Sequence, residues 1–406
     1  MTDKNKHIPQ GYKDSPLGII PKEWEVKRLG EVCTFLDSQR IPIKDADRGK
    51  MQGKYPYYGA SGIIDYVNDY IFDDDLILLG EDGANIIMRS TPLAFLVSGK
   101  VWINNHAHVL KTKSGFSRYY VCSYLESLSY DKYNTGTAQP KLNREVCEKI
   151  PVLLPPKKEQ NRLSELFTTW DTAIEKQSEL IEKLKLRKRA LMQQLLTGKK
   201  RLPGFGGEWK EIKLGDIFDE RNETNRDDLP LLSITGDRGV IYQSDSDKRD
   251  ISNDDKSKYK RICPNDIGYN TMRMWQGRSA LSNIEGIVSP AYTIVTPHKN
   301  VDVRFMAMLI QQPRIVYDFW THSQGLVSDT LNCKYPDFCQ VKVRIPSKEE
   351  QTAIADLLYE FDKEINLANE KLASLQSQKR GLMQQLLTGK KRIKELKDYE
   401  KRRKQA

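Results

Sequence analysis

Apolar residues recur with a seven-residue period along two long stretches of the chain. In the first, residues 157–197 contain neither proline nor glycine, and the apolar positions lie alternately three and four residues apart. This spacing predicts a helix of about 40 residues, roughly 60 Å long, with one apolar seam. A second helix of the same pattern follows residue 346, where Ser347 and Glu350 fit a capping box. Because a helix with a single apolar stripe is unstable alone, we expect the two to pair as an antiparallel coiled coil. The predicted seam residues are Leu163, Trp170, Ile174, Ile181, Leu184, Leu191, Ile354, Phe361, Ile365, Leu372, Leu375 and Leu382.

Both helices belong to an internal duplication. The eleven residues from Leu191 to Arg201 recur unchanged from Leu382 to Arg392, at an offset of 191. Lys188 and Lys379 therefore occupy equivalent seam positions, where a polar residue can fix the register or can reach solvent along its apolar stem. The other matching segments are 155–160 with 346–351, and 23–30 with 208–215.

The duplication predicts an alternating order of unit and helix. Antiparallel pairing would place the two units at opposite ends of a rod, about an approximate two-fold axis. Since the flanks agree but residues 35–145 and 220–335 share little, we expect two equivalent docking surfaces and two different recognised targets. A duplication that has diverged without functional asymmetry is the alternative. The predicted boundaries are 1–154 for the first unit, 155–201 for the first helical region, 202–345 for the second unit, 346–392 for the second helical region and 393–406 for a basic tail.

Within each unit, short apolar stretches alternate with glycine and aspartate. Such stretches predict strands, and shorter helical patterns occur near residues 117–128 and 303–318. The expected fold class is α+β: two units, each with a mixed, mostly antiparallel sheet and short helices, separated by two long antiparallel helices with pseudo-two-fold symmetry.

The composition favours a polyanionic partner. The 406 residues carry 65 Lys and Arg against 55 Asp and Glu, a net charge of +10. This charge fits nucleic acid or an anionic membrane surface. No membrane span or signal peptide is expected, and six cysteines without a CxxC pair indicate reduced thiols in a cytoplasmic protein. The basic run at residues 183–201 could face phosphates, although a solvated charged face is the default interpretation.

Both variable units carry side chains suited to DNA. Arginine pairs with guanine, and asparagine or glutamine with adenine, in the major groove. For any one of these residues, a structural role or a phosphate contact is the competing interpretation. The candidate DNA-binding residues are Tyr58, Arg89, Asn104, Asn105, His106, Asn270, Arg273, Gln276, Arg278 and Tyr292.

No motif for catalysis is found. The sequence lacks a phosphate-binding loop, a dinucleotide fingerprint, a nucleophile elbow and a zinc-protease motif. His106 and His108 could form half of a metal site, but no third ligand follows at a fixed spacing, so no metal is predicted. These absences favour a recognition protein. An interaction scaffold and a self-sufficient nuclease are the alternative functions.

The whole pattern resembles the specificity (S) subunit of type I restriction–modification systems. The resemblance lies in both Leu-Met-Gln-Gln-Leu-Leu-Thr-Gly runs, in Gly136–Asn143 before the first helix, and in Trp24 with its copy. Within the units, Tyr58–Ile64, Gly80–Asn85 and Asn104–His108 are similar to one class of target recognition domain, and Gly286–Tyr292 to another. One departure is the segment 325–332, which replaces the Gln-Pro-x-Leu-Asn pattern before the second helix.

The resemblance implies a function and a set of partners. Each target recognition domain would read one half of a bipartite target in double-stranded DNA, and the helices would set the spacer. Two methyltransferase (modification) subunits would dock on the helices, joined by two ATP-dependent restriction (translocase–nuclease) subunits. No cofactor would bind this chain, because S-adenosylmethionine, ATP and Mg²⁺ would belong to those partners.

Overall fold

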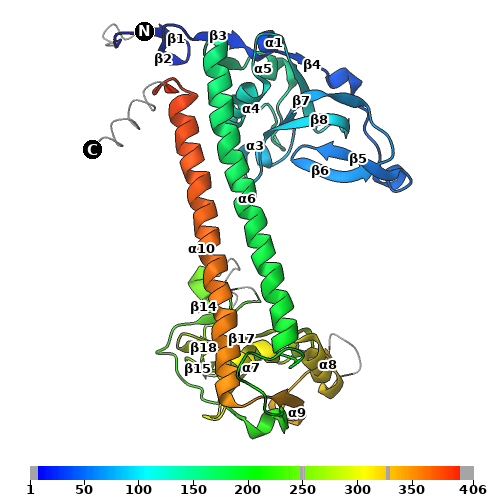
Figure 1. The fold of residues 1–406 in the computed structure, drawn as a ribbon, viewed down its shortest axis with the longest axis vertical. Helices are drawn as coiled ribbons and strands as arrows, with labels where there is room; N and C mark the ends of the chain where they lie inside the picture. The colour runs from blue at the N-terminus through cyan, green and yellow to red at the C-terminus, as the bar shows by residue number, and fades with distance from the viewer. Residues whose placement is uncertain (1–7, 237, 247–249, 251, 326–329, 394–406) are drawn as a thin grey trace. The chain divides into compact units, whose positions relative to one another are not determined.

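The computed structural model describes residues 8–236, 238–246, 250, 252–325 and 330–393. It divides the chain into two compact units. Unit 1 comprises residues 1–178 and 370–406, and unit 2 comprises residues 179–369. Each long helix begins in one unit and ends in the other: α6 spans Lys157–Leu195 and α10 spans Lys348–Leu386 (Figure 1).

Unit 1 is built on a six-stranded sheet in the order β4-β9-β7-β8-β5-β6. All neighbouring strands are antiparallel except β5 and β8, which are parallel. Alternate residues of β7 face opposite sides, so that Ile77 and Leu79 join the core that contains α4, while Leu76 and Leu78 join a second core. The strands are β4 (Cys33–Phe35), β5 (Gln52–Gly59), β6 (Gly62–Val67), β7 (Phe72–Gly80), β8 (Ala94–Ile103) and β9 (Ala107–Thr112).

Smaller elements complete unit 1. The hairpin β1–β2 and the antiparallel pair β3–β10 lie outside the main sheet. Their bounds are β1 (Tyr12–Ser15), β2 (Gly18–Pro21), β3 (Glu25–Arg28) and β10 (Pro151–Leu154). The short helices are α1 (Leu29–Val32), η1 (Asp37–Gln39), α2 (Asp45–Arg48), α3 (Asn85–Met88), α4 (Arg118–Ser127), η2 (Asp131–Tyr133) and α5 (Arg144–Glu148).

Unit 2 contains a four-stranded antiparallel sheet in the order β12-β19-β16-β17. Three two-stranded pairs accompany it: β13–β14, β15–β18 and β11–β20. The strands are β11 (Lys210–Lys213), β12 (Phe218–Glu220), β13 (Leu232–Ile234), β14 (Val240–Tyr242), β15 (Lys260–Ile262), β16 (Ile267–Asn270), β17 (Ser279–Leu281), β18 (Gly286–Val288), β19 (Tyr292–Pro297) and β20 (Lys342–Ile345). The helices are η3 (Leu214–Asp216), η4 (Gln243–Asp245), η5 (Met274–Gln276), α7 (Val303–Leu309), α8 (Pro313–His322) and α9 (Tyr335–Gln340).

The two units share one sheet topology despite their dissimilar sequences. The order β4-β9-β7-β8 in unit 1 corresponds to β12-β19-β16-β17 in unit 2. The pairs β3–β10 and β11–β20 also correspond, because each joins the start of a unit to the strand before a long helix. The α+β class expected from the sequence is therefore confirmed, with the duplication extending into the variable regions.

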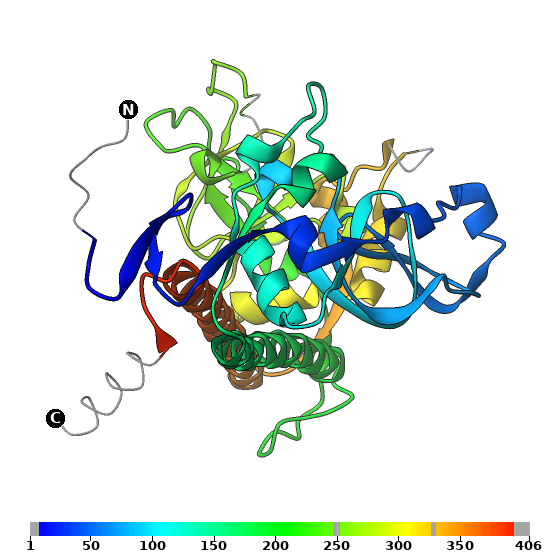
Figure 2. The same cartoon turned by 90° about the horizontal axis from the view of Figure 1, so that it is seen from above.

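Within each unit, α6 and α10 lie side by side and run antiparallel (Figure 1 and Figure 2). In unit 1, Leu163 and Phe167 of α6 share a core with Leu386 at the end of α10. In unit 2, Leu195 at the end of α6 shares a core with Ile354 near the start of α10. Of the twelve predicted seam residues, all of which the structure describes, none is exposed.

Two local predictions need correction. The helical pattern near 303–318 is two helices, because Pro313 has no backbone N–H to continue the first and instead begins α8. The carboxylate of Glu350 binds Arg201 rather than the backbone N–H of Ser347. Gly198 and Gly389 follow the two long helices in the left-handed region, with φ of 69° and 71°, as expected for residues just beyond a helix end. The predicted basic tail lies outside the described residues apart from Ile393.

Candidate nucleic-acid interface

The loops at one edge of each sheet lie together. In unit 1, the N–H of Glu81, just after β7, donates to the carbonyl of His106 at 2.8 Å. The carbonyl of Glu81 in turn accepts from the N–H of Leu142 at 2.7 Å. These bonds connect three loops, and we call residues 81–89, 104–106 and 134–142 the loop edge of unit 1.

Unit 2 repeats this arrangement. The N–H of Thr271, just after β16, donates to the carbonyl of Ala291 at 3.1 Å, and its carbonyl accepts from the N–H of Cys333 at 2.9 Å. The corresponding loop edge of unit 2 comprises residues 271–278, 289–291, 324–325 and 330–333, and residues 326–329 lie outside the described part of the chain. The same backbone frame thus presents different side chains in the two units.

Four predicted DNA-binding residues meet at or beside the loop edge of unit 1. The N–H of Asn104 donates to the carbonyl of Tyr58, and the buried Asn104 side chain accepts from the N–H of His106 at 2.8 Å. Asn104 therefore shapes the turn, whereas Asn105 and His106 are exposed on it. His106 Nδ1 lies 2.9 Å from a carboxylate oxygen of Asp82. Tyr58 is half-buried on β5.

Arg89 is held inside unit 1. Its backbone is left-handed, with φ of 51°, at the end of α3. Its guanidinium lies 2.8 Å from the Glu126 carboxylate, donates to the Glu126 carbonyl, and stacks 5.8 Å from the centre of the Tyr130 ring. These contacts favour a structural role, and its role in DNA binding stays a prediction.

Three of the candidate DNA-binding residues of unit 2 are exposed to solvent and could reach a ligand without breaking other contacts. Arg273, Gln276 and Arg278 are exposed, and among the described residues their side chains make no hydrogen bond or ion pair. Asn270 caps the turn, because its side chain accepts from the N–H of Met272 at 3.0 Å. Tyr292 is half-buried, with its hydroxyl 3.5 Å from the Ile234 carbonyl.

Sequence reasoning missed three residues of the loop edges. Met88 and Met272 are 72% and 47% exposed. Met88 is the last residue of α3 and Met272 lies in a turn, and each belongs to the segment that follows an equivalent strand. Lys141 also lies there, 3.5 Å from Glu81. Each methionine directly precedes an arginine, Arg89 or Arg273, in the segment after a strand, and this pattern is the signal that could have identified them.

A buried ionic cluster lies behind the loop edge of unit 1. His108 Nδ1 donates to Asp37 at 2.7 Å and Nε2 donates to the Leu142 carbonyl at 2.8 Å. Burial lowers the pKa of His108, but its interactions with Asp37 and Cys147 outweigh burial and raise that pKa to about 10. Because both ring nitrogens are engaged and His106 points elsewhere, the two histidines do not form half of a metal site. No cluster of metal-ligating side chains occurs among the residues that the structure describes.

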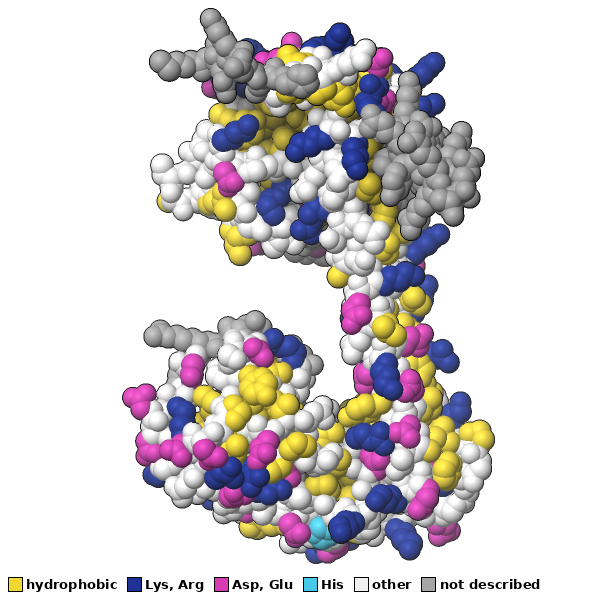
Figure 3. All heavy atoms as spheres, turned by 90° about the vertical axis from the view of Figure 1, so that its left-hand side faces the viewer, with side chains coloured by type: hydrophobic (Ala, Val, Ile, Leu, Met, Phe, Trp, Pro, Cys, Tyr) yellow, Lys and Arg dark blue, Asp and Glu magenta, His cyan; other side chains and the backbone are white. Residues whose placement is uncertain are grey.

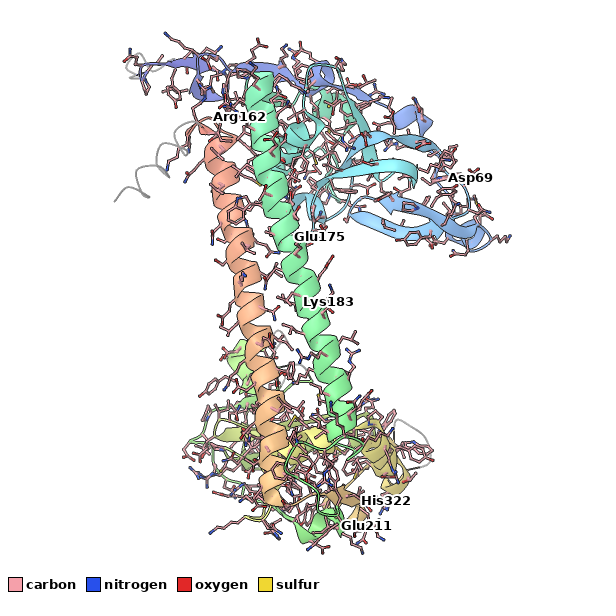
Figure 4. The ribbon with its side chains drawn as sticks, in the orientation of Figure 1. Asp69, Arg162, Glu175, Lys183, Glu211 and His322 are labelled. Atoms are coloured by element: carbon pink, nitrogen blue, oxygen red, sulfur yellow. The ribbon has the colours of Figure 1, made fainter. Side chains whose placement is uncertain are left out.

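The repeated helix sequences make repeated contacts. Lys188 binds Asp362 in unit 2, and its equivalent Lys379 binds Asp171 in unit 1. In the same way Arg201 binds Glu350 in unit 2, and Arg392 binds Glu159 in unit 1. Each pair is related to its counterpart by the sequence offset of 191. Other charged residues of α6, such as Glu175 and Lys183, are exposed (Figure 4).

A groove of about 990 Å³ adjoins the end of α6 in unit 2. Its basic and aromatic lining residues are Lys199, Arg201, Trp209, Arg314, His322, Lys342 and Arg344. On the face drawn in Figure 3, Lys and Arg side chains are prominent over unit 1, whereas unit 2 mixes them with Asp and Glu. No described helix has the length and hydrophobicity needed to cross a membrane.

Comparison with known proteins gives a consistent result. The family model for the type I restriction modification DNA specificity domain matches twice, at residues 21–186 and 206–377. A putative type I restriction enzyme specificity subunit of Haemophilus influenzae, S.HindORF215P, is 28% identical over 373 residues, covering 88% of this chain and 93% of that protein. The MjaVIII specificity subunit of Methanocaldococcus jannaschii is 23% identical over 424 residues, covering 93% and 95%.

Solved structures show the same fold. The crystal structure of the type I restriction–modification S subunit from M. genitalium matches with a TM-score of 0.55 at 13% identity, covering 89% of this chain and 95% of that one. A chain from a study of type I system assembly and conformational transition matches with a TM-score of 0.53 at 15% identity, covering 91% and 99%.

Proposed function

The chain belongs to the family of type I restriction–modification DNA specificity subunits, and from this premise we propose that each unit reads one half of a bipartite DNA target through its loop edge. As a member of that family it is a non-catalytic subunit that determines DNA target recognition, and it is part of a type I restriction–modification complex.

One observation carries the proposal. The two loop edges share a backbone frame but present different polar side chains: Asn105 and His106 in unit 1, and Arg273, Gln276 and Arg278 in unit 2. A common frame with different donors is what two readers of different base pairs require, because the hydrogen-bonding pattern of the major groove differs for each base pair. The residue roles, and the recognition domains at 1–154 and 202–345, are part of this proposal.

We further propose that the repeated helical contacts serve repeated partners. Equivalent surfaces beside Arg201–Glu350 and Arg392–Glu159 suit two copies of one methyltransferase subunit, with two restriction subunits joining that core. S-adenosylmethionine, ATP and Mg²⁺ would then bind those partners, and the assembly would act in the cytoplasm on double-stranded DNA. The helical regions 155–201 and 346–392 would set the spacer between the two half-sites.

Exchange of one variable region tests the modular function. Residues 35–145 are replaced by the corresponding region of a relative with another target, and the complex with its methyltransferase partner is used to map methylated sequences. One half of the target should change while the other half and the spacer stay the same. A change in both halves would contradict the proposal.

Affinity gives a second measure. The wild-type complex should keep a large ratio of specific to nonspecific DNA binding as salt rises, because base contacts do not depend on counterion release as phosphate contacts do. Weak, sequence-independent binding would favour the scaffold alternative instead.

A further inference from the structure

We propose that Asp37, Arg40, Glu81 and His108 form a positioning network that holds the turn 104–107 of unit 1 in its DNA-binding shape before DNA arrives. The inference rests on the proposed function, since it concerns how the loop edge of unit 1 is kept ready to read its half-site.

His108 ties three segments together from inside the unit. Its side chain is 1% exposed on β9. One ring nitrogen donates to the Asp37 carboxylate in η1 and the other donates to the Leu142 carbonyl at the end of segment 134–142. Because neither acceptor carries a proton to give, both ring nitrogens must carry hydrogen, and the ring is a cation. The second Asp37 oxygen accepts from the N–H of Val109 at 2.8 Å, which fixes η1 against β9.

Arg40 holds the turn itself. Its Nη1 donates to the carbonyl of Ala107 at 2.8 Å and lies 3.3 Å from the carbonyl of Asn105. The same nitrogen donates to the Glu81 carboxylate at 2.7 Å, and its Nε donates to the Asp37 carbonyl at 3.0 Å. One guanidinium therefore fixes the backbone on both sides of His106, whose side chain is exposed to solvent.

The charges within the network balance. Two carboxylates, Asp37 and Glu81, face two cations, Arg40 and His108, and Lys141 lies 3.5 Å from Glu81 at the solvent side. Burial raises the pKa of Asp37, but its hydrogen bond and charge interaction with His108 outweigh burial, and the net pKa lies below its usual value. Removing one member would leave an uncompensated charge and a looser turn. DNA would then have to order this turn on binding, which reduces the binding free energy.

Unit 2 supplies a matched control. Asp266 is 1% exposed and pairs with Arg221 at 2.6 Å. However, it lies just before β16, at the opposite end of that strand from Thr271 and the loop edge. Loss of the Asp266 pair should weaken unit 2 without disturbing a DNA-reading turn.

The experiment compares four variants of the full chain assembled with its methyltransferase partner: His108→Gln, Arg40→Met, Arg40→Lys and the control Asp266→Asn. Arg40→Lys keeps the charge but cannot donate to all of the same oxygens at once. Methylation rates are measured on duplexes that carry single base-pair substitutions in either half of the target. Thermal unfolding of each variant is recorded in parallel.

The three network variants should lose about ten-fold discrimination at positions in one half-site only, the size of one good base contact. Asp266→Asn should keep discrimination in both halves despite lower stability. If the network variants kept full discrimination in both halves, whether or not they were destabilised, the network would not hold the reading turn and the inference would be overturned. Relaxed discrimination in both halves would also overturn it. The exchange of residues 35–145 gives an independent result, so failure of the network is distinguishable from failure of the proposed function.

Discussion

Arg201→Met should destabilise the protein more than Arg392→Met, although the two arginines are equivalent in the duplication. Arg201 donates two hydrogen bonds of 2.5 Å to Glu350, whose side chain is only 2% exposed. Arg392 donates bonds of 2.8 and 2.6 Å to Glu159, whose side chain is 10% exposed. Removing either arginine leaves a buried carboxylate without its cation.

The difference comes from the neighbouring tryptophans. The indole N–H of Trp24 lies 3.2 Å from Glu159 and remains as a donor when Arg392 is removed. The equivalent indole N–H, on Trp209, is buried without a partner among the described residues. It therefore donates no hydrogen bond to Glu350 that would remain after Arg201 is removed. Breaking a buried ion pair costs about 3–5 kcal/mol, and the partial exposure of Arg201 favours the lower end, about 3 kcal/mol. The hydrogen bond from Trp24 to the charged Glu159 contributes about 1.5 kcal/mol and is kept in the variant. Arg392→Met should therefore lower the free energy of local opening by only about 1.5–2 kcal/mol.

Hydrogen exchange measured by mass spectrometry resolves the two sites. Peptides covering residues 208–214 report on unit 2 and peptides covering residues 23–29 report on unit 1, and protection converts to a free energy of local opening. The double variant Arg201→Met, Glu350→Met should recover most of the loss, because apolar replacement removes the unpaired charge. Equal losses at the two sites, or a double variant as unstable as Arg201→Met, would refute the reasoning.

Two further predictions concern charge. The pKa of His108 is about 10 in the folded chain and about 6.5 when unfolded. Its contribution to the free energy of unfolding is therefore complete below pH 6.5 and is lost as the pH rises towards 10. The stability difference between the wild-type chain and His108→Gln, measured by urea unfolding, should therefore shrink from pH 6 to pH 9.5, and growth of that difference would contradict the assignment. Lys188→Asp should lower the free energy of unfolding by about 1 kcal/mol, because the new carboxylate faces that of Asp362. Adding Asp362→Lys should restore the wild-type unfolding midpoint. No restoration would mean that the contact does not form in solution.

The long helices were predictable because their signal is local. A seven-residue period needs only neighbouring residues, and the duplication then supplies the partner, so the pairing of α6 with α10 follows from sequence. The individual contacts do not follow. Lys188 was recognised as a seam residue, but Asp362 lies 174 residues away. The sheet order likewise depends on pairings such as parallel β5–β8, which local alternation does not encode. Pro313, by contrast, could have divided the predicted 303–318 helix from sequence alone.

The candidate site was predicted only in part, because local sequence shows which residues are polar but not which distant residues bind them. Asn105 and His106 lie on an exposed turn, as a polar run between strands suggests, and Arg273, Gln276 and Arg278 are exposed after β16. Arg89 carried the same local signal but is bound by Glu126, 37 residues further along the chain. His108 was considered as a metal ligand and as part of the segment Asn104–His108, but not as an ion-pair partner, because Asp37 is 71 residues earlier. Residue type identifies chemistry, whereas long-range pairing decides whether that chemistry faces solvent.

The way unit 1 obtains its core has a consequence for biosynthesis. Met383 and Leu386, in the last turn of α10, and Leu387, just after it, are buried among residues from the first half of the chain. A ribosome that has completed Ser178 must therefore add roughly two hundred more residues before this core can close, which takes about 10–40 s at ordinary elongation rates. During that interval the nascent first half exposes an apolar surface, so chaperone capture and premature termination should affect this protein more severely than one whose domains mature in order.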